Sequence, residues 1–265
     1  MKKLNAVLLA AVLAGGAGLC AETFELGKPA DWKAVSGSIK WVGEKQDIME
    51  VKGSAMLTST REFPVDVTKV YEMEAYAKLV SSVSGPCYLG FTVFDKGGRQ
   101  IPAYAVNATG GSETTLAREV KVGDKTILVK AAPKWVKGAF QVVVWGAKKD
   151  LSDLPNYNFV GDVTGMQNVG ENVEVTLKVP AKAAVPAGVP VRLHSQGGYM
   201  YTGGFCMPKT DDFTRLKGKA KGRTKYGMYG GVWAPGAVKA KVIMLVNWGK
   251  YKETTQVKGV KLEIK

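Results

Sequence analysis

Histidine is almost absent from this 265-residue chain, in which His194 is the only one. The sequence also lacks G-x-S-x-G and H-E-x-x-H motifs and any cluster of cysteines with histidines. These absences remove the usual signatures of serine hydrolases, zinc proteases and zinc sites. A lone histidine beside Ser195 is more often a surface or satisfied residue than a catalyst.

Paired carboxyl groups with supporting signals are also missing. Glycoside hydrolysis generally needs two carboxyl groups in defined positions. The candidates lie in strand-like or turn settings that are typical of solvated charges: Glu72, Glu74, Asp211 and Asp212. We therefore predict that the protein is not an enzyme, although a lyase that uses tyrosine with arginine or lysine stays an alternative.

After the first residues, no apolar run reaches the ~18–20 residues that a membrane helix requires. The chain begins with two lysines, an apolar run over 6–13 and small residues over 15–18, as in a secretory signal peptide. We expect cleavage after Ala21 and a protein that is secreted, periplasmic or at the cell surface. Cys20 suggests lipidation as an alternative, but the residue before it, Leu19, is not small.

Cysteine is scarce, and removal of residues 1–21 would leave two. An even count outside the cytoplasm favours a disulfide between Cys87 and Cys206. The alternative is a pair of small buried thiols, because cysteine is among the most buried residue types.

Acidic residues are the minority, and the precursor carries a net charge of +14. Without the signal peptide, 35 basic residues face 23 acidic ones, which leaves +12. Much of the excess is lysine on alternating strand positions, which is typical of a solvated face. For an exported protein, an acidic glycan, cell-wall polymer or lipid headgroup is a better partner than nucleic acid.

Strand-like alternation is abundant. Residues 70–79 alternate apolar with charged side chains, and 87–94 repeat the pattern before a turn over Asp95–Gly98. Short apolar segments about ten residues apart predict an all-β sandwich for residues 22–265. Between 107 and 198 this alternation is interrupted by a loop and a polar stretch, followed by four short strand-like segments, which predicts an inserted β subdomain. Its loop over 150–158 is dense in oxygen-bearing side chains, but the spacing matches no calcium cage.

One stretch resembles a known family. Phe91, Asp95, Gly98 and Ile101 follow the pattern F-x-x-x-D-x-x-G-x-x-I, which is similar to the central strand-turn-strand of galactose-binding-like jelly rolls. These are the carbohydrate-binding modules of bacterial glycan-degrading proteins. The run Trp233–Gly236 with the long strand after it is similar to their second half. The resemblance covers about residues 23–106 and 199–265 and implies a jelly-roll β-sandwich.

The family's calcium site is not reproduced. Many of these modules end on D-D-[IV]-x-[LF], in which an aspartate helps to hold structural calcium, whereas Lys258 and Gly259 stand at those positions here. We therefore carry no metal ligand over, and expect no cofactor beyond a doubtful structural calcium.

Aromatic residues suggest where a ligand binds, since sugar rings stack on Trp and Tyr while polar neighbours fix the hydroxyls. Three lie in a glycine-rich run beside two basic residues, and three more flank the insertion, so the predicted ligand-binding residues are Tyr226, Tyr229, Trp233, Arg223, Lys225, Tyr199, Tyr201 and Tyr104. Core packing is an equal alternative for Trp233, and it is the better interpretation of Trp41 and Trp248.

The leading functional hypothesis is an exported, non-catalytic carbohydrate-binding protein that holds a polysaccharide by aromatic stacking and a basic surface. The alternative is a structural or envelope protein that uses the sandwich for protein–protein contacts. A groove with polar partners favours sugar, and a flat apolar patch favours protein.

Overall fold

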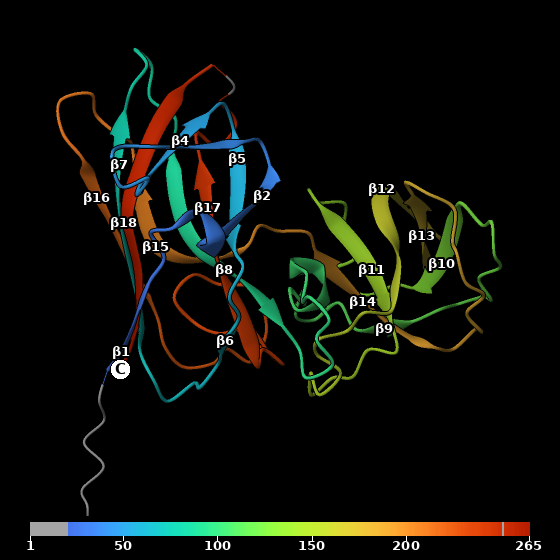
Figure 1. Ribbon diagram of the computed structural model, residues 1–265. Coiled ribbons are helices and arrows are strands. Elements are labelled where there is room, and N and C mark those ends of the chain that lie inside the picture. The colour runs from blue at the N-terminus through green and yellow to red at the C-terminus, as the bar shows by residue number, and fades with distance from the viewer. Residues whose placement is uncertain (1–20, 251) are drawn as a thin grey trace, which may run out of the picture.

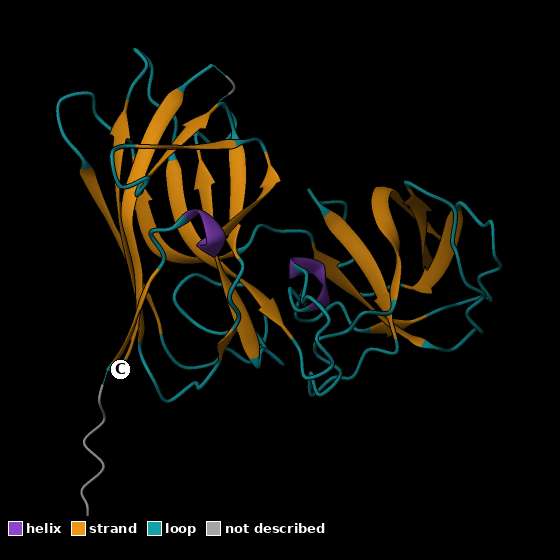
Figure 2. Ribbon diagram, in the orientation of Figure 1, coloured by secondary structure: helices purple, strands orange, loops and turns teal. Residues whose placement is uncertain are grey.

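The computed structural model describes residues 21–250 and 252–265. Residues 1–20 of the predicted signal peptide, with Cys20 among them, lie outside this part, so cleavage and export stay predictions. Within it, strands dominate, and the helical elements are two short 3₁₀ turns, η1 (Pro29–Asp31) and η2 (Ala103–Ala105) (Figure 2). No helix in the described residues has the length and apolar character needed to cross a bilayer.

Two antiparallel sheets form the sandwich (Figure 1). The first, sheet A, has the order β16 (Thr214–Ala220), β7 (Tyr71–Leu79), β18 (Thr254–Ile264), β4 (Ile48–Lys52) and β3 (Ile39–Val42), with β1 (Glu22–Glu25) also paired to β18. The pairing of β1 with β18 sets Glu22 opposite Ile264. The two ends of the described chain therefore lie side by side, as the ordered first and last strands predict.

The second sheet, sheet B, has the order β15 (Met200–Cys206), β8 (Cys87–Phe94), β17 (Lys239–Val246), β5 (Ala55–Ser59) and β2 (Trp32–Ser36), with β6 (Phe63–Pro64) also on β17. Strands far apart in the sequence thus lie side by side, as in a jelly roll. The all-β, jelly-roll prediction is confirmed.

A third sheet lies outside the sandwich (Figure 1). Its order is β10 (Thr126–Lys130), β13 (Asn172–Leu177), β12 (Phe159–Val169), β11 (Gln141–Trp145), β14 (Pro190–Ser195) and β9 (Thr114–Thr115). A bridge between Leu116 and Val129 brings the two edges together. The result is a small barrel inserted between β8 and β15, and the boundaries 107 and 198 stay a prediction for where it can be cut.

Each part has its own apolar core. In the sandwich, alternate residues of β7 and β8 point inward, where they meet the inner faces of β17 and β18. A separate cluster fills the barrel, with Ile127, Val143, Val175 and Leu193 among its buried members. Because period-2 alternation places one side of each strand inside, the opposite side of each sandwich sheet is the candidate for function.

Candidate functional site

The outer face of sheet A is a network of paired charges. Arg215 lies 2.6 Å from Glu74, and Lys265 lies 2.8 Å from Glu72 and 2.7 Å from Glu263. These hydrogen bonds from cations hold the pKa values of the three carboxyl groups below their ordinary range. A carboxyl group with a lowered pKa is a poor proton donor, so this face is better suited to solubility than to glycoside hydrolysis.

The outer face of sheet B is different, because aromatic rings cover it. Tyr201 on β15 lies 5.5 Å from Tyr88 on β8, and Tyr88 lies 5.2 Å from Phe205, measured between ring centroids. Tyr88, Tyr199 and Tyr201 pack on a floor of three buried residues, Met56, Ile243 and Leu245. We call Tyr199, Tyr201, Tyr88 and Phe205 the aromatic row.

Local backbone structure sets the row. Gly90 stands opposite Tyr201, and a Cβ atom there would lie 2.8 Å from the Met200 carbonyl oxygen. Only glycine therefore lets β15 approach β8 this closely. An irregularity between Tyr201 and Phe205 then interrupts the ladder, after which Phe205 lies opposite Tyr88. Burial raises the pKa of the Tyr201 hydroxyl, which keeps it protonated as a hydrogen-bond donor.

The aromatic row borders a cavity of about 350 Å³. Its walls come from β8 and β15 and from the two chain segments that connect the sandwich with the barrel. Tyr199 and Tyr201 line it, together with the polar side chains of Gln100 and Gln196 and the exposed ring of Trp248. An apolar floor, stacking rings and amide groups at the rim are the features with which proteins hold sugars.

The predicted loop site is divided by the structure. Trp233 is fully buried, and its ring lies 4.8 Å from Tyr71 and 4.9 Å from Phe91. The ligand-binding prediction for Trp233 is therefore wrong, and the core alternative holds. The Arg223 guanidinium donates to the Ala237 carbonyl oxygen at 2.7 Å, so this side chain supports the loop.

The other loop residues stay on the surface. Tyr226 and Tyr229 are 42% and 48% exposed and pack edge-to-face with centroids 5.9 Å apart. Lys225 is exposed beside them. Tyr226 lines a different hollow of about 230 Å³, which Lys149 and Glu113 also line. The structure thus places Tyr199 and Tyr201 at one cavity and Tyr226 at another.

Tyr104 lies at the junction of sandwich and barrel. Its half-buried ring contacts Phe159 with centroids 5.1 Å apart, and its carbonyl oxygen lies 2.5 Å from Nδ1 of His194. Its neighbour Ala103 lines the cavity. Tyr104 is therefore next to the site without lining it.

The residues that sequence reasoning missed are Tyr88, Phe205, Trp248, Gln100 and Gln196. Tyr88 and Phe205 occupy the outward phase of strands whose alternate residues, such as Leu89 and Cys206, are buried, and large rings at outward positions are a signal that could have found them. Trp248 is 40% exposed, so the interpretation of this residue as core is wrong. The half-buried Trp41 packs against the sandwich core as expected.

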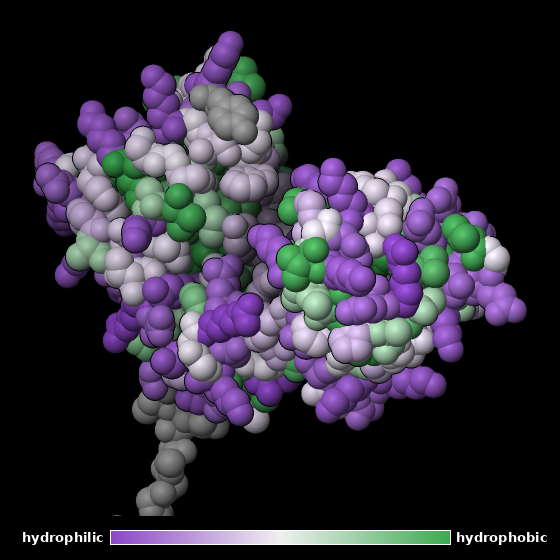
Figure 3. Space-filling view, turned by 90° about the vertical axis from the view of Figure 1, so that its right-hand side faces the viewer, coloured by the Kyte–Doolittle hydropathy of each residue, from purple (hydrophilic) through white to green (hydrophobic). Residues whose placement is uncertain are grey.

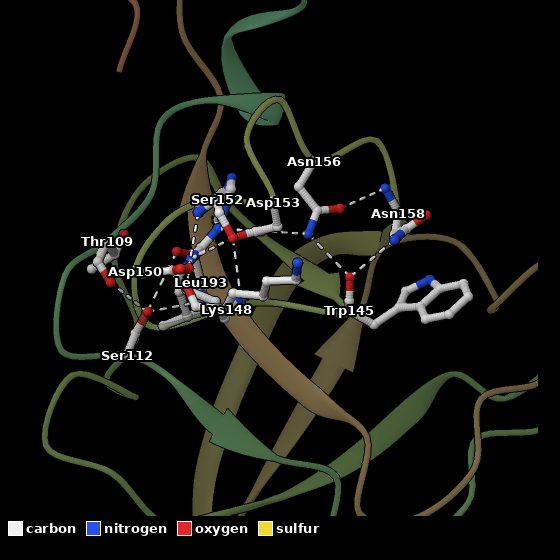
Figure 4. Close-up of polar contacts among 12 residues, drawn as sticks. Thr109, Ser112, Trp145, Lys148, Asp150, Ser152, Asp153, Asn156, Asn158 and Leu193 are labelled. Atoms are coloured by element: carbon white, nitrogen blue, oxygen red, sulfur yellow. Dashed lines mark hydrogen bonds and ion pairs between the residues drawn. The ribbon is translucent and has the colours of Figure 1, made fainter. Parts of the chain in front are cut away.

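A buried polar network ties the barrel to the sandwich. Arg192 on β14 is fully buried, and its Nη2 lies 2.7 Å from Oδ2 of Asp153. Its Nε donates to Nε2 of His194 at 2.9 Å, which requires the tautomer with hydrogen on Nδ1, and Nδ1 then donates to Tyr104. Asn156 donates to both Asp153 and the Trp145 carbonyl oxygen (Figure 4). We call Arg192, Asp153, His194 and Tyr104 the junction network.

This network also accounts for the oxygen-rich loop over 150–158. Asp153 accepts from Arg192, and the Oδ1 of Asp150 accepts from the Ser152 backbone at 3.0 Å (Figure 4). Among the described residues, no group of three acidic, cysteine or histidine side chains has the arrangement of a metal site.

No protein-family model matches the chain, and no curated protein matches its sequence. Solved structures give weak matches. A CBM22-1 xylan-binding domain from Paenibacillus barcinonensis Xyn10C matches at 10% identity and a TM-score of 0.32, over 92% of both chains. A lectin from Bauhinia forficata in complex with GalNAc matches at 9% and 0.31, over 93% and 99%. An arabinose-bound α-L-arabinofuranosidase matches at 9% and 0.31, over 89% of this chain and 23% of its own.

These are distant β-sandwich likenesses, and at such scores they carry no argument about the site. The chain spans about a quarter of the arabinofuranosidase.

Proposed function

We propose that this protein is an exported, non-catalytic carbohydrate-binding protein that holds a polysaccharide along the aromatic row of sheet B. The observation that carries the proposal is the set of rings on neighbouring strands beside a cavity with two glutamine side chains at its rim. Tyrosine and phenylalanine faces stack on sugar C–H groups, and the amides satisfy hydroxyl groups.

The chemistry of the two outer faces supports binding over catalysis. The carboxyl groups Glu72 and Glu74 lie in ion pairs on sheet A, away from the rings of sheet B. Most of the surface in Figure 3 is hydrophilic, with hydrophobic side chains in small separate patches. That distribution fits a sugar groove better than a broad protein interface.

The net positive charge favours an acidic glycan. Lys241 on β17 is half-buried on the outer side of sheet B, and its ammonium lies 5.9 Å from the Phe94 ring centroid. The Lys241 ammonium is already paired with Glu62 at 3.6 Å. We therefore expect ring stacking to contribute more to glycan affinity than ion pairs do.

Affinity electrophoresis of the chain without residues 1–21, in gels that contain polygalacturonate, xylan or mannan, tests the proposal. We expect retardation in at least one gel, and about tenfold weaker binding by Tyr88→Ala and Tyr201→Ala, which is about 1.4 kcal/mol each. Val83→Ala, an exposed residue off the row, is the control. Equal migration in every gel would overturn the proposal in favour of a structural or envelope role.

A further inference from the structure

The barrel exposes two phenylalanine rings near the cavity. Phe140 precedes β11 and is 77% exposed, and Phe159 begins β12 and is 39% exposed. Single exposed apolar residues are common on protein surfaces. Phe140 is unusual because its φ is 57°, in the left-handed region that bulky residues rarely adopt.

The conformation of Phe140 is costly, and packing does not account for it. A non-glycine residue held in this region carries backbone strain and persists where the surrounding structure imposes it. The Phe140 ring, however, lies in solvent and not in a core. Strained backbone positions cluster at active sites and ligand clamps, so an exposed ring at such a position is a candidate for ligand contact.

Phe140 is next to a residue of the cavity wall. Its carbonyl oxygen accepts a hydrogen bond of 2.7 Å from the Gln196 backbone, which continues the pairing of Gln141 with Ser195. Gln196 lines the cavity, and its side chain donates to Oδ1 of Asp162 at 3.0 Å. Phe140 does not line the cavity itself, but it is one backbone hydrogen bond from the cavity wall on the barrel side.

Phe159 reaches the same region from β12. It pairs with Val144, a residue outside the barrel core cluster that holds the neighbouring Val143. The ring packs on Tyr104, whose neighbours Ala103 and Pro102 line the cavity. Both phenylalanines thus belong to the side of the barrel that meets the sandwich.

The junction network keeps this side of the barrel in place. Arg192 and His194 lie on β14 directly before Gln196, and Tyr104 belongs to the segment that leaves the sandwich. A second link joins the Tyr157 hydroxyl to Asp95 at 2.7 Å, with the Arg99 guanidinium 3.8 Å from the Tyr157 ring centroid. A binding wall that is fixed before the ligand arrives loses less entropy on binding.

We propose that Phe140 and Phe159 form a second stacking wall, so that a glycan chain is held between the sandwich and the barrel. This inference rests on the proposed function and specifies its ligand as an extended chain. A single sugar fits the aromatic row alone, whereas a longer chain reaches the barrel wall as well.

The test is isothermal titration calorimetry with oligosaccharides, from monomer to hexamer, of the glycan whose gel retards the protein. These are oligogalacturonides for polygalacturonate, xylo-oligosaccharides for xylan and manno-oligosaccharides for mannan. For wild-type protein we expect affinity to rise with chain length. Phe140→Ala and Phe159→Ala should bind the hexamer about tenfold more weakly and the shortest bound oligomer as well as wild type does. Val122→Ala, which removes an exposed side chain elsewhere on the barrel, should match wild type.

The variant Phe140→Gly separates an effect on glycan binding from an effect on folding. Glycine adopts positive φ without strain, so this variant should retain or raise the melting temperature while losing hexamer affinity. Hexamer binding equal to wild type in all three phenylalanine variants would overturn the second wall. If Tyr201→Ala still binds more weakly in that case, the proposed function stands. If the wild-type protein binds none of the oligosaccharides, both the second wall and the proposed function are wrong.

Discussion

Cys87 on β8 and Cys206 on β15 lie directly opposite each other on neighbouring antiparallel strands. The structure holds both as buried thiols in place of the predicted disulfide. The side-chain interaction between the two thiols lowers the pKa of Cys87 and, with burial, raises the pKa of Cys206.

We predict that oxidation with diamide joins this pair without disturbing the sheet, because opposed strand residues have Cβ atoms close to the separation that a disulfide needs. The bond closes a long loop and should stabilise the fold by about 2–4 kcal/mol. Ellman titration of the denatured protein should then find no free thiol, and urea unfolding should shift to higher concentration. Cys206→Ser is the control, and two free thiols after oxidation of wild type would contradict the prediction.

The sandwich could be predicted from sequence because its strands are half-buried. In β7, every second residue from Tyr71 to Leu79 is buried and the residues between them are half-buried. That alternation can be read directly from the sequence, because the buried face of a strand requires an apolar residue at every second position. The pairing of β7 with β16 and β18 depends on contacts between distant segments, which local pattern does not encode.

The site was only partly predictable for a related reason. The glycine-rich setting of Trp233 indicates a loop, but the Trp233 ring lies in the sandwich core against Tyr71 and Phe91. The aromatic row joins Tyr88 to Tyr201, more than a hundred residues apart, through the register of β8 and β15. Residues that become neighbours through long-range register leave no local motif.

We predict that stability falls as pH drops from about 6.5 to 4, because burial lowers the pKa of His194 to about 4. The unfolded chain binds a proton in this window and the native chain does not, so unfolding becomes more favourable as pH decreases. Protonation would place an N–H on Nε2 against the Nε–H of Arg192 and disrupt the junction network. The full loss is on the order of 3 kcal/mol.

Urea unfolding at pH values across this window measures the effect. His194→Gln is the matched variant, because an amide can accept from Arg192 and donate to Tyr104 without titrating. Its stability should change much less over the same window. Since His194 is the chain's only histidine, an equal slope in both proteins would assign the effect to carboxyl groups.

Trp233 and Tyr71 are neighbouring buried rings that differ in whether their polar group has a hydrogen-bond partner. The Trp233 Nε1 finds no hydrogen-bond partner among the described residues, whereas the Tyr71 hydroxyl donates to the Pro64 carbonyl oxygen at 2.8 Å and accepts from the Asp66 amide at 2.7 Å. We predict that Trp233→Phe costs less than about 1.5 kcal/mol, because removal of an unpaired N–H offsets lost packing. Tyr71→Phe should cost about 1–3 kcal/mol, because it removes both hydrogen bonds of the Tyr71 hydroxyl. Thermal unfolding of both variants measures the difference, and a larger loss for Trp233→Phe would contradict it.

Removal of the barrel should leave a folded sandwich, because the two core clusters have no member in common. The cut can be placed where the chain leaves and returns. The Ser195 amide donates to the Asn107 carbonyl oxygen at 3.0 Å, and a Cβ on Gly197 would lie 2.8 Å from the Asn107 side chain. A short glycine linker from Asn107 to Gly197 therefore spans the gap without strain, and it keeps the Asn107 Oδ1 that accepts from the Met228 amide.

We expect this shortened chain to unfold in one cooperative transition by calorimetry, with a lower melting temperature because the contacts of Tyr157 and His194 with the sandwich are lost. It should still bind the shortest bound oligomer, more weakly because Gln196 is lost, since Tyr88, Tyr201 and Phe205 lie on β8 and β15 and Tyr199 directly precedes β15. A chain that lacks a cooperative transition would make the barrel part of the sandwich's folding unit. A cooperative chain that binds the hexamer as tightly as the full protein would leave the barrel with no share in the site.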